Sequence, residues 1–533
     1  MSGLDLKRPS IPPFISDLYA DRTALNGLIV GSAALFASAL DPKVWGPSLP
    51  SVQAAIAESP QLEALSLLAM LGGSALVLLG GALGDSVRAK PIIAGGLAVE
   101  LIAALISMLV PSGPVLLASR FIGHAAAAFI IPASLALVAT SYNGITRATA
   151  IGLAYAGFGA AGALAPVLLK LDLTGWTPAF LGAIVACAIA LVIVRGRIPE
   201  LVRPSLPERV YVVRTAVWAF GIITVTVGVT WIGTPFGNPL RWGLVLAGLA
   251  ILGLAILHDR RTRRAGAGEV HIDQRPVAIA VIVGVILGIA NTAPMMLLPR
   301  YFQLILSYGP LLATAALAPL FAALILAGPA AGFLLSRWSP RRLIGVGTIA
   351  VGAGDLLLAL IATPSAGYLL FIIPCLAIGA GFVLATTVRT AIIFASVSRG
   401  LPATAAALNE ASAAVGARIG VVIVTATVGQ VAIATYTASV SGLPVAEAQQ
   451  AVTAFQGVLS AIGLPSFNEV AAAIDPSNIA PYVEAYSTGI RAALALSGAT
   501  AVIGGLIGWL ALGRRDPLTT VWEHSEEREA APA

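Results

Sequence analysis

The sequence predicts an all-α protein that crosses a membrane many times. The chain has 533 residues, of which 58% are hydrophobic and 11% are charged, whereas soluble domains carry about 25% charged residues. Its apolar residues gather in runs of about 20, the length that a helix needs to cross the hydrocarbon core of a bilayer. Short loops rich in arginine separate many of these runs, as expected of a multi-pass protein.

Fourteen runs are long enough to span. In chain order they lie at 24–44, 64–84, 91–110, 115–140, 147–170, 176–195, 210–232, 239–258, 276–298, 310–335, 342–361, 367–395, 402–435 and 486–512. The two cysteines, Cys187 and Cys375, fall inside such runs and indicate neither a disulfide framework nor a metal site.

The charges of the loops predict the orientation of the chain. Arg or Lys occurs in the loops near 85–90, 141–147, 195–209, 258–275, 336–342 and 396–401, and in none of those near 45–63, 111–114, 233–238, 362–367 and 436–485; Arg300 lies in the remaining loop. Because basic loops stay on the cytoplasmic side, this alternation places both termini in the cytoplasm of a cell whose plasma membrane holds the chain. We attribute the net charge of +6 to this topology and not to nucleic-acid binding.

The spans divide as six, two and six. A cytoplasmic segment, 1–22, precedes a six-helix bundle, 23–195; two inserted helices with basic linkers occupy 196–275; a second six-helix bundle covers 276–512, and a cytoplasmic tail covers 513–533. The outer loop 436–485 contains the amphipathic pattern VAEAQQAVTAFQGVLSAIG, which predicts a helix. This loop is either a solvated cap or a lid over the outer mouth.

The loop between the second and third spans carries charged residues in a recognisable pattern. It reads GALGDSVRAKPII and holds Gly81, Asp85, Arg88 and Lys90. A related stretch, GFLLSRWSPRRLI, recurs between two later spans and holds Arg337 and Arg341, with Ser336 in place of the acid. One device used twice indicates an internal repeat and a transporter.

The first loop resembles the signature G-x-L-G/A-D-x-x-G-R-R/K of the major facilitator superfamily, with Arg88 at the second glycine. That resemblance implies two six-helix bundles that rock around a central site, with these loops as cytoplasmic gating contacts. The inserted pair of helices gives fourteen spans, which resembles the drug:proton antiporter subfamily of the EmrB/QacA type.

Ionisable residues inside the spans mark candidate sites because they are costly there. Asp41 lies in a stretch that resembles the family's L-D-x-T-I-V-N-V-A-L-P, where the acid helps to carry protons or bind cations. Its competing interpretation is an acid at a helix end paired with Lys43. Arg120 and His124, four residues apart, share one face of the fourth span. The resemblance ties Arg120 to proton coupling, with Asp41 or Glu100 as its carboxylate partner; His124 either shares the proton or is a packing residue.

Two further stretches complete the candidate set. Gly162 and Pro166 of the fifth span resemble the antiporter signature G-x-x-x-G-P-x-x-G-G, although Ala165 and Lys170 depart from it. Asn409 and Glu410, in the span at 402–435, fall in a stretch that resembles the family pattern. Glu410 is an acid in an apolar helix, which makes it a candidate proton or cation site.

The sequence therefore predicts a proton-coupled secondary transporter that exports amphipathic or lipophilic compounds of the multidrug type. No G-x-x-x-x-G-K-S/T loop occurs, so we expect an ion gradient and not ATP to drive it, without cofactor or metal. The alternative is export of one endogenous lipid, siderophore or secondary metabolite. A membrane-embedded enzyme or sensor fits less well, since the four histidines are dispersed. Expected partners are the substrate, protons and membrane lipids, and we expect a monomer.

Overall fold

A computed structural model of the chain describes residues 13–56, 76–110, 112–170, 178–197, 239–264, 274–397, 401–461 and 479–512, with a few residues between 217 and 228. The described chain is helical, as expected where membrane-spanning backbone must satisfy its own hydrogen bonds. The helices are α1 (Pro13–Ala20), α2 (Arg22–Ile56), α4 (Ala89–Leu109), α5 (Gly113–Ser141), α6 (Gly144–Leu169), α7 (Pro178–Arg197), α9 (Pro239–Arg264), α10 (Gln274–Leu304), α11 (Pro310–Ala315), α12 (Ala318–Leu335), α13 (Pro340–Ile361), α14 (Leu369–Ser396), α15 (Pro402–Ser439), α16 (Val445–Ala461) and α18 (Ile479–Ala511).

Within the described residues, 11 helices are long and apolar enough to cross a membrane. They correspond to eleven of the predicted spans. The three others are 64–84 and 210–232, which lie largely outside the described residues, and 239–258, where the apolar part of α9 is limited to Trp242–Ala255. The many-span helical protein is confirmed, and the total of fourteen stays a prediction.

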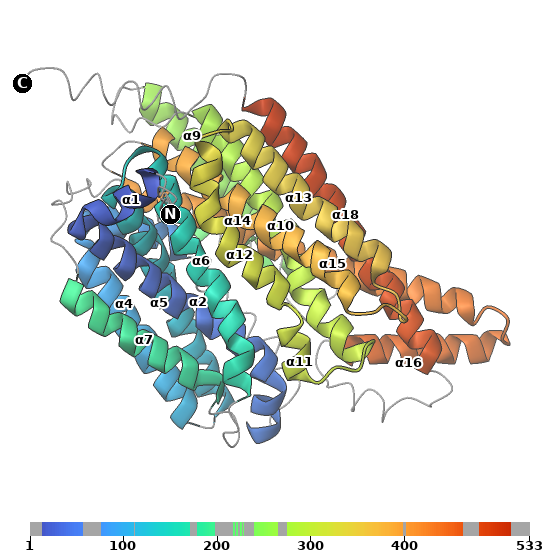
Figure 1. Ribbon diagram of the computed structural model, residues 1–533. Coiled ribbons are helices and arrows are strands. Elements are labelled where there is room, and N and C mark those ends of the chain that lie inside the picture. Colours follow the sequence, from blue (N-terminus) through green and yellow to red (C-terminus); the bar gives the residue numbers. More distant parts are fainter. Residues whose placement is uncertain are drawn as a thin grey trace, which may run out of the picture.

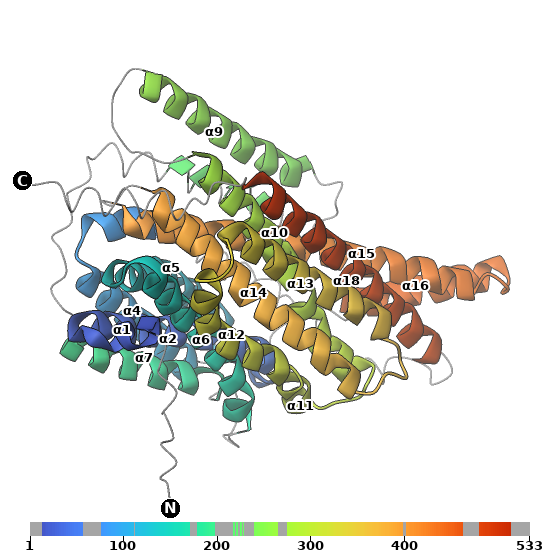
Figure 2. The same cartoon turned by 45° about the horizontal axis from the view of Figure 1, so that its top comes forward.

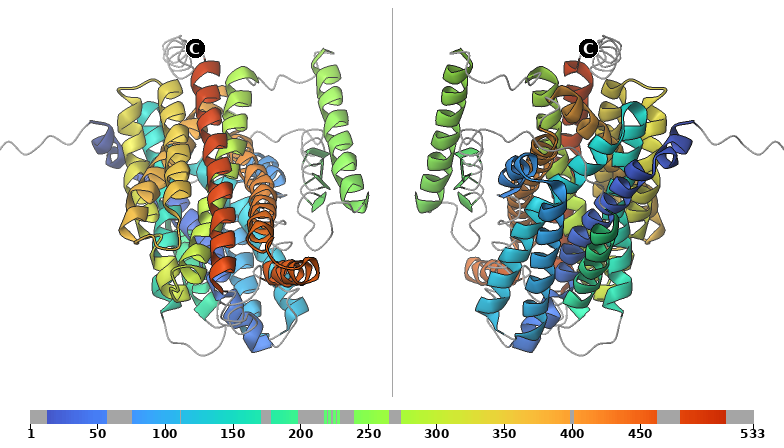
Figure 3. Two further views of the ribbon diagram at one scale, coloured as in Figure 1. Left: turned by 90° about the vertical axis from the view of Figure 1, so that its right-hand side faces the viewer. Right: turned by 90° about the vertical axis from the view of Figure 1, so that its left-hand side faces the viewer.

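The spanning helices form two groups (Figure 1). The first contains α2, α4, α5, α6 and α7, and the second contains α10, α12, α13, α14, α15 and α18. Figures 2 and 3 show α9 to one side of both groups. There, Gly248 of α9 packs closely on Val225 and Gly221 in the described part of the 217–228 segment.

Several helix boundaries differ from the sequence prediction for local reasons. The candidate span Arg22–Trp45 agrees with the predicted span 24–44, but the helix α2 continues past it, through Pro47 and Pro50, to Ile56. The predicted span 310–335 contains two helices: α11 ends at Ala315 and α12 begins at Ala318. Proline occupies the first or second position of α5, α11, α12, α13 and α15, where its missing N–H costs nothing.

The long loop predicted at 436–485 contains the helix that its pattern indicated. This helix, α16, lies beside the ends of α15 and α18, at the end of the molecule far from α1 (Figure 1). Tyr436, Phe455 and Tyr482 contribute one ring each from these three helices, with ring centroids 4.6–4.8 Å apart. Their contact packs α16 against the second group of helices.

The two groups meet closely along α6 and α12. A Cβ atom on Gly152 of α6 would meet the backbone carbonyl of Gly328 on α12, with the carbonyl carbon at 2.7 Å. A Cβ atom on Gly328 would likewise meet the backbone of Gly152. Two glycines without side chains therefore set the distance between the groups at this point.

We expect Gly152→Ala to destabilise the protein by about 1–3 kcal/mol, because backbone and not a movable side chain occupies the space of the new methyl group. The measurement is thermal unfolding of the purified chain in detergent. Gly157→Ala is the matched control on the same helix: its Cβ would meet the Ser32 carbonyl oxygen at 3.4 Å, an ordinary contact. Equal melting temperatures for the two variants would contradict the close packing of α6 on α12.

Candidate functional site

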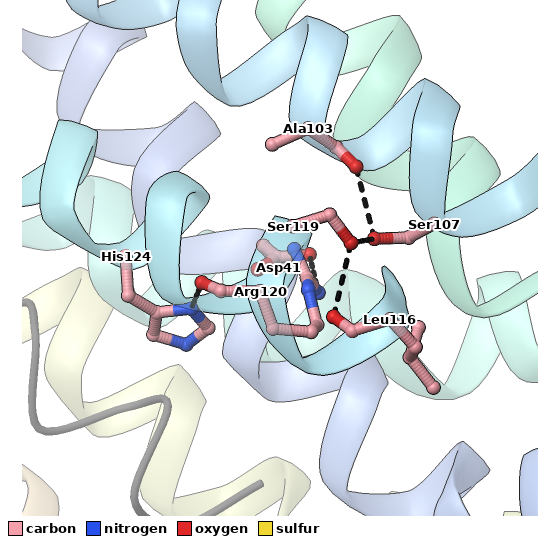
Figure 4. Close-up of polar contacts among 7 residues, drawn as sticks. All are labelled: Asp41, Ala103, Ser107, Leu116, Ser119, Arg120 and His124. Carbon is pink, nitrogen blue, oxygen red and sulfur yellow. Dashed lines mark hydrogen bonds and ion pairs between the residues drawn. The ribbon is translucent and has the colours of Figure 1, made fainter. Parts of the chain in front are cut away.

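The first group of helices contains a buried ion pair. Arg120 of α5 donates from Nη1 to Oδ1 of Asp41 on α2 at 2.7 Å, and each side chain is less than 5% exposed (Figure 4). The guanidinium also lies 5.5 Å from the ring centroid of Trp45 and 5.2 Å from that of Phe180. Of the two partners expected for Arg120, the ion pair forms with Asp41.

The interpretation of Asp41 as a helix-end acid paired with Lys43 is wrong. Asp41 lies inside α2, which continues for a further 15 residues to Ile56. Residues two apart on a helix point to different sides, so Asp41 and Lys43 face different neighbours. The amino group of Lys43 is 3.9 Å from Sδ of Met295 on α10, in the second group of helices.

A second acid lies close to this pair without joining it. Glu100 of α4 is buried and accepts a hydrogen bond of 2.9 Å from the Ser38 hydroxyl, one turn before Asp41 on α2. Beside them, the hydroxyls of Ser107 and Ser119 are 2.7 Å apart and join α4 to α5 (Figure 4). Sequence reasoning missed both serine contacts, since single serines in apolar helices carry little signal.

The ring of His124 takes part in a local bond. Its Nδ1 lies 2.8 Å from the backbone carbonyl oxygen of Arg120, four residues earlier on α5, and the close-up draws no contact between the ring and Asp41 (Figure 4). Its Nε2 is buried and has no hydrogen-bond partner in the described part of the chain. This geometry gives the His124 ring a packing role. A role of His124 in proton transfer stays a prediction.

The two groups of helices are joined by a polar contact around Glu410. Tyr155 of α6 donates its hydroxyl to Oε1 of Glu410 on α15 at 2.7 Å. The Asn409 amide donates to the same oxygen at 3.0 Å and to the Tyr155 hydroxyl at 2.8 Å. Thr390 of α14 lies 3.3 Å from that hydroxyl. The acid and amide expected from the sequence are therefore held by a tyrosine that sequence reasoning missed.

Arg389 of α14 is hydrogen-bonded to the part of α15 that carries Glu410. Nη1 of Arg389 donates to the Ser412 hydroxyl at 2.6 Å and to the Asn409 carbonyl at 3.1 Å. Arg389 thereby fixes the turn of α15 that carries Glu410. Since α15 begins at Pro402, Glu410 lies about 12 Å from that end at 1.5 Å per residue. Glu410 therefore lies in the first third of this 38-residue helix.

The signature loop also connects the two groups. Asp85, at the end of the described helix Leu76–Ser86, accepts hydrogen bonds from the backbone amides of Ala403 at 2.7 Å and Thr404 at 2.9 Å. Both amides belong to the first turn of α15, where N–H groups lack partners within the helix. The structure thus gives Asp85 two partners in the opposite group of helices.

The glycines of both loop copies allow a neighbouring helix to come close. A Cβ on Gly81 would meet the Ala403 carbonyl oxygen at 2.8 Å. In the second copy, a Cβ on Gly332 would meet Cα of Thr149 on α6 at 2.9 Å. Each copy thus faces a helix of the other group. Nearby, Arg337 lies over the Phe333 ring at 4.4 Å, and Arg341 is half-buried in the first turn of α13.

The predicted antiporter-motif residues lie on α6. A Cβ on Gly162 would strike the ring of Phe321 on α12, with Cζ at 2.6 Å, so the glycine makes room for this ring. Pro166 is inside α6, three residues before its end. In the described part of the chain, no three His, Cys, Asp or Glu side chains are grouped to hold a metal ion.

The model of the Major Facilitator Superfamily matches residues 31–421 of the chain. The chain belongs to this superfamily. It is 28% identical over 437 residues to the puromycin resistance protein pur8 of Streptomyces alboniger, covering 79% of this chain and 84% of that protein. It is 27% identical over 304 residues to a triacylglyceride transporter of Mycolicibacterium hassiacum, covering 54% and 55%.

The fold matches solved structures of the superfamily. The human organic anion transporter MFSD10 superposes with a TM-score of 0.55 at 12% identity, with 93% of this chain and all of that chain covered. At this identity the likeness shows the fold alone. The superfamily and its fold indicate a membrane transporter and not an enzyme.

The Asp85 contact predicts a response to pH. Burial raises the pKa of the Asp85 carboxyl from 3.8 to about 6, while its bonds to Ala403 and Thr404 oppose that shift. When the loop leaves α15 for water, the pKa returns toward 3.8. Between pH 4 and pH 6 the packed state therefore binds a proton that the separated state releases, so acid favours the packed state and this effect is lost as the pH rises through 6.

We expect acidification from pH 7 to pH 5 to raise the fraction of molecules in which the loop packs on α15. The measurement is the distance between spin labels on α4 and α15 in detergent. Asp85→Asn keeps one acceptor but does not titrate, so it should lose this pH response. Asp85→Ala removes both bonds and should weaken the packing by about 1–3 kcal/mol. Ser86→Ala, which removes only a local bond to the Ala82 carbonyl, is the control. A pH response that survives in Asp85→Asn contradicts the assignment.

Proposed function

We propose that the chain is a proton-coupled secondary transporter that exports amphipathic or lipophilic compounds by alternating access. Membership of the superfamily supports transport, and the likeness to a puromycin resistance protein supports export. In this proposal the helix groups rock against each other, and each of the contacts α6–α12, Asp85–α15 and Tyr155–Glu410 either opens or acts as a pivot.

One observation supports proton coupling most directly: the Glu410 carboxyl is hydrogen-bonded across the two groups of helices. Tyr155 belongs to the first group and Glu410 to the second, so the 2.7 Å bond between them exists only while the groups are packed at this point. Separation of the groups changes what surrounds the carboxyl. A titratable acid whose surroundings differ between two states binds protons differently in each, which is the requirement for coupling.

A specialised exporter is the second candidate. The stretches around Asp41 and Pro166 match the patterns of the drug antiporters only in part, with Ala165 and Lys170 departing from the second, and one relative is named as a triacylglyceride transporter. These two observations favour an endogenous lipid, siderophore or secondary metabolite as substrate. They leave the proton-coupled mechanism unchanged.

The finer organisation of the chain belongs to the same proposal. We place it in the plasma membrane with both termini in the cytoplasm, and we divide it at 23–195, 196–275 and 276–512 into six, two and six spans of the drug:proton antiporter subfamily. The alternation of basic and uncharged loops supports this layout. We propose a monomer that exchanges substrate for protons without a cofactor.

Inverted membrane vesicles that contain the full chain test this function. A neutral or an anionic lipophilic dye should accumulate inside when the lumen is made acidic, and should leave when an ionophore collapses the pH gradient. Vesicles from cells that lack the chain are the control. Accumulation that is indifferent to the gradient would contradict proton coupling, and no accumulation of either compound would favour the specialised exporter.

A further inference from the structure

Lys43 on α2 reaches from the first group of helices to the second. Its Nζ lies 3.9 Å from Sδ of Met295 on α10 and 5.3 Å from the centroid of the Phe321 ring on α12. These contacts place a cation at the junction of three helices, two of which belong to the opposite group. The side chain is therefore at the interface that rearranges when the groups rock.

Within the described part of the chain, no carboxylate oxygen lies within the 4.0 Å limit of an ion pair with Lys43. The nearest acid along the chain, Asp41, faces the other way and is bound to Arg120. Glu100 accepts from Ser38. Asp41 and Glu100 are thus bound elsewhere, and within the part of the chain that the structure describes the Lys43 amino group meets a thioether and an aromatic ring.

A sulfur atom and a ring face are weak partners for an ammonium group. A cation–π contact stabilises an ammonium group less than an ion pair does, and Lys43 lies within the candidate span Arg22–Trp45, where a charge is costly. A charged side chain inside a membrane usually pairs with a side chain of opposite charge. An anion that enters this interface would gain a charge-assisted hydrogen bond without displacing an existing carboxylate.

The surroundings of Lys43 suit an apolar body beside that anion. Phe321 and Met295 present a ring and a flexible thioether, the adaptable groups that bind varied apolar shapes. Gly162 lies against the Phe321 ring, where any side chain would displace it. The small residue thereby holds the ring in the position from which it faces Lys43.

We propose that Lys43 binds the acidic head group of the substrate, so that the exported class is amphipathic anions: one carboxylate, sulfonate or phosphate group on an apolar body. The apolar body lies on Phe321 and Met295. This assignment rests on the proposed export function and narrows it, since a lipophilic cation would meet the lysine with like charge.

Binding to the purified full chain in phosphatidylcholine nanodiscs tests the assignment. The probes are dansylamino-undecanoic acid and its primary amide, which differ in charge and hardly in size. We expect the wild-type chain to bind the acid about tenfold more tightly than the amide. Lys43→Gln should reduce this ratio to about one while the affinity for the amide stays within about twofold. Lys43→Arg, which keeps the charge, should keep the preference.

Lys170→Gln is the matched control, because it removes a lysine from the exposed end of α6 without touching the interface. A wild-type chain that binds both probes equally would overturn the assignment, whether or not the Lys43 variants fold. So would a tenfold preference that persists in Lys43→Gln. Binding is measured without a gradient, so loss of proton-driven transport in vesicles contradicts the proposed function alone, and loss of the acid preference contradicts the Lys43 site alone.

Discussion

Asp41→Asn is expected to destabilise the protein by about 3–5 kcal/mol, the cost of removing one partner from a buried ion pair. The Arg120 guanidinium is 1% exposed, and Asp41 is the one carboxylate bonded to it among the described residues. Its Nε and Nη2 have no hydrogen-bond partner there, so the single bond at 2.7 Å supports the charge. Asparagine keeps the shape of the side chain but leaves that charge with only Trp45 and Phe180.

The measurement is a double-mutant cycle by thermal unfolding in detergent. Arg120→Gln alone should also destabilise, while the double variant Asp41→Asn/Arg120→Gln should recover most of the loss, because no unpaired charge then remains. Asp17→Asn on the exposed face of α1 is the control for removal of a carboxylate and should change little. A stable Asp41→Asn chain would show that another acid balances Arg120; Glu100, on Ser38, is the first to test by adding Glu100→Gln.

Hydropathy predicted where the spanning helices lie, but it did not predict where each helix ends. Eleven predicted spans match helices because runs of about 20 apolar residues have one stable structure in a bilayer. The predicted span 24–44 agrees with the candidate span Arg22–Trp45, but the helix α2 continues beyond that span, through Pro47 and Pro50, to Ile56. Proline is tolerated in membrane helices when neighbouring groups satisfy the freed carbonyls, and a single sequence does not reveal those neighbours.

The candidate site was predictable where two partners each carried a signal. Asp41 and Arg120 are both charges inside apolar runs, so their pairing followed from the cost of leaving either alone. Tyr155 gave no comparable signal, because a tyrosine in a span is ordinary until its hydroxyl is seen on Glu410. The partners of Asp85 are backbone amides more than 300 residues away, and amides have no sequence signature.

Lys43 shows why nearness in sequence did not decide the partner of Asp41. The competing interpretation paired Asp41 with Lys43, which is two residues away. The 3.6-residue helical repeat turns the two side chains to different groups of helices, where Arg120 and Met295 are their neighbours.

Glu410→Gln is expected to abolish the proton release that accompanies substrate binding, from a measurable fraction of a proton per molecule to none. The glutamine carbonyl can still accept from Tyr155 and Asn409, as the carboxylate does at 2.7 Å and 3.0 Å. The contact between the helix groups is thus retained, and binding of a neutral substrate should stay within about threefold of the wild type. In the proposed mechanism, the variant loses the carboxyl group that exchanges a proton.

The measurement is the change in a pH-indicator dye when substrate is added to purified protein in weak buffer. Tyr155→Phe is the matched variant: it removes the donor on α6 but leaves the acid, so proton release should persist. Because Arg389 holds the same turn through Ser412 and the Asn409 carbonyl, Ser412→Ala should likewise keep release. If Glu410→Gln still releases a proton, the coupling acid lies in the first group, and adding Glu100→Gln or Asp41→Asn to it identifies which carboxyl exchanges.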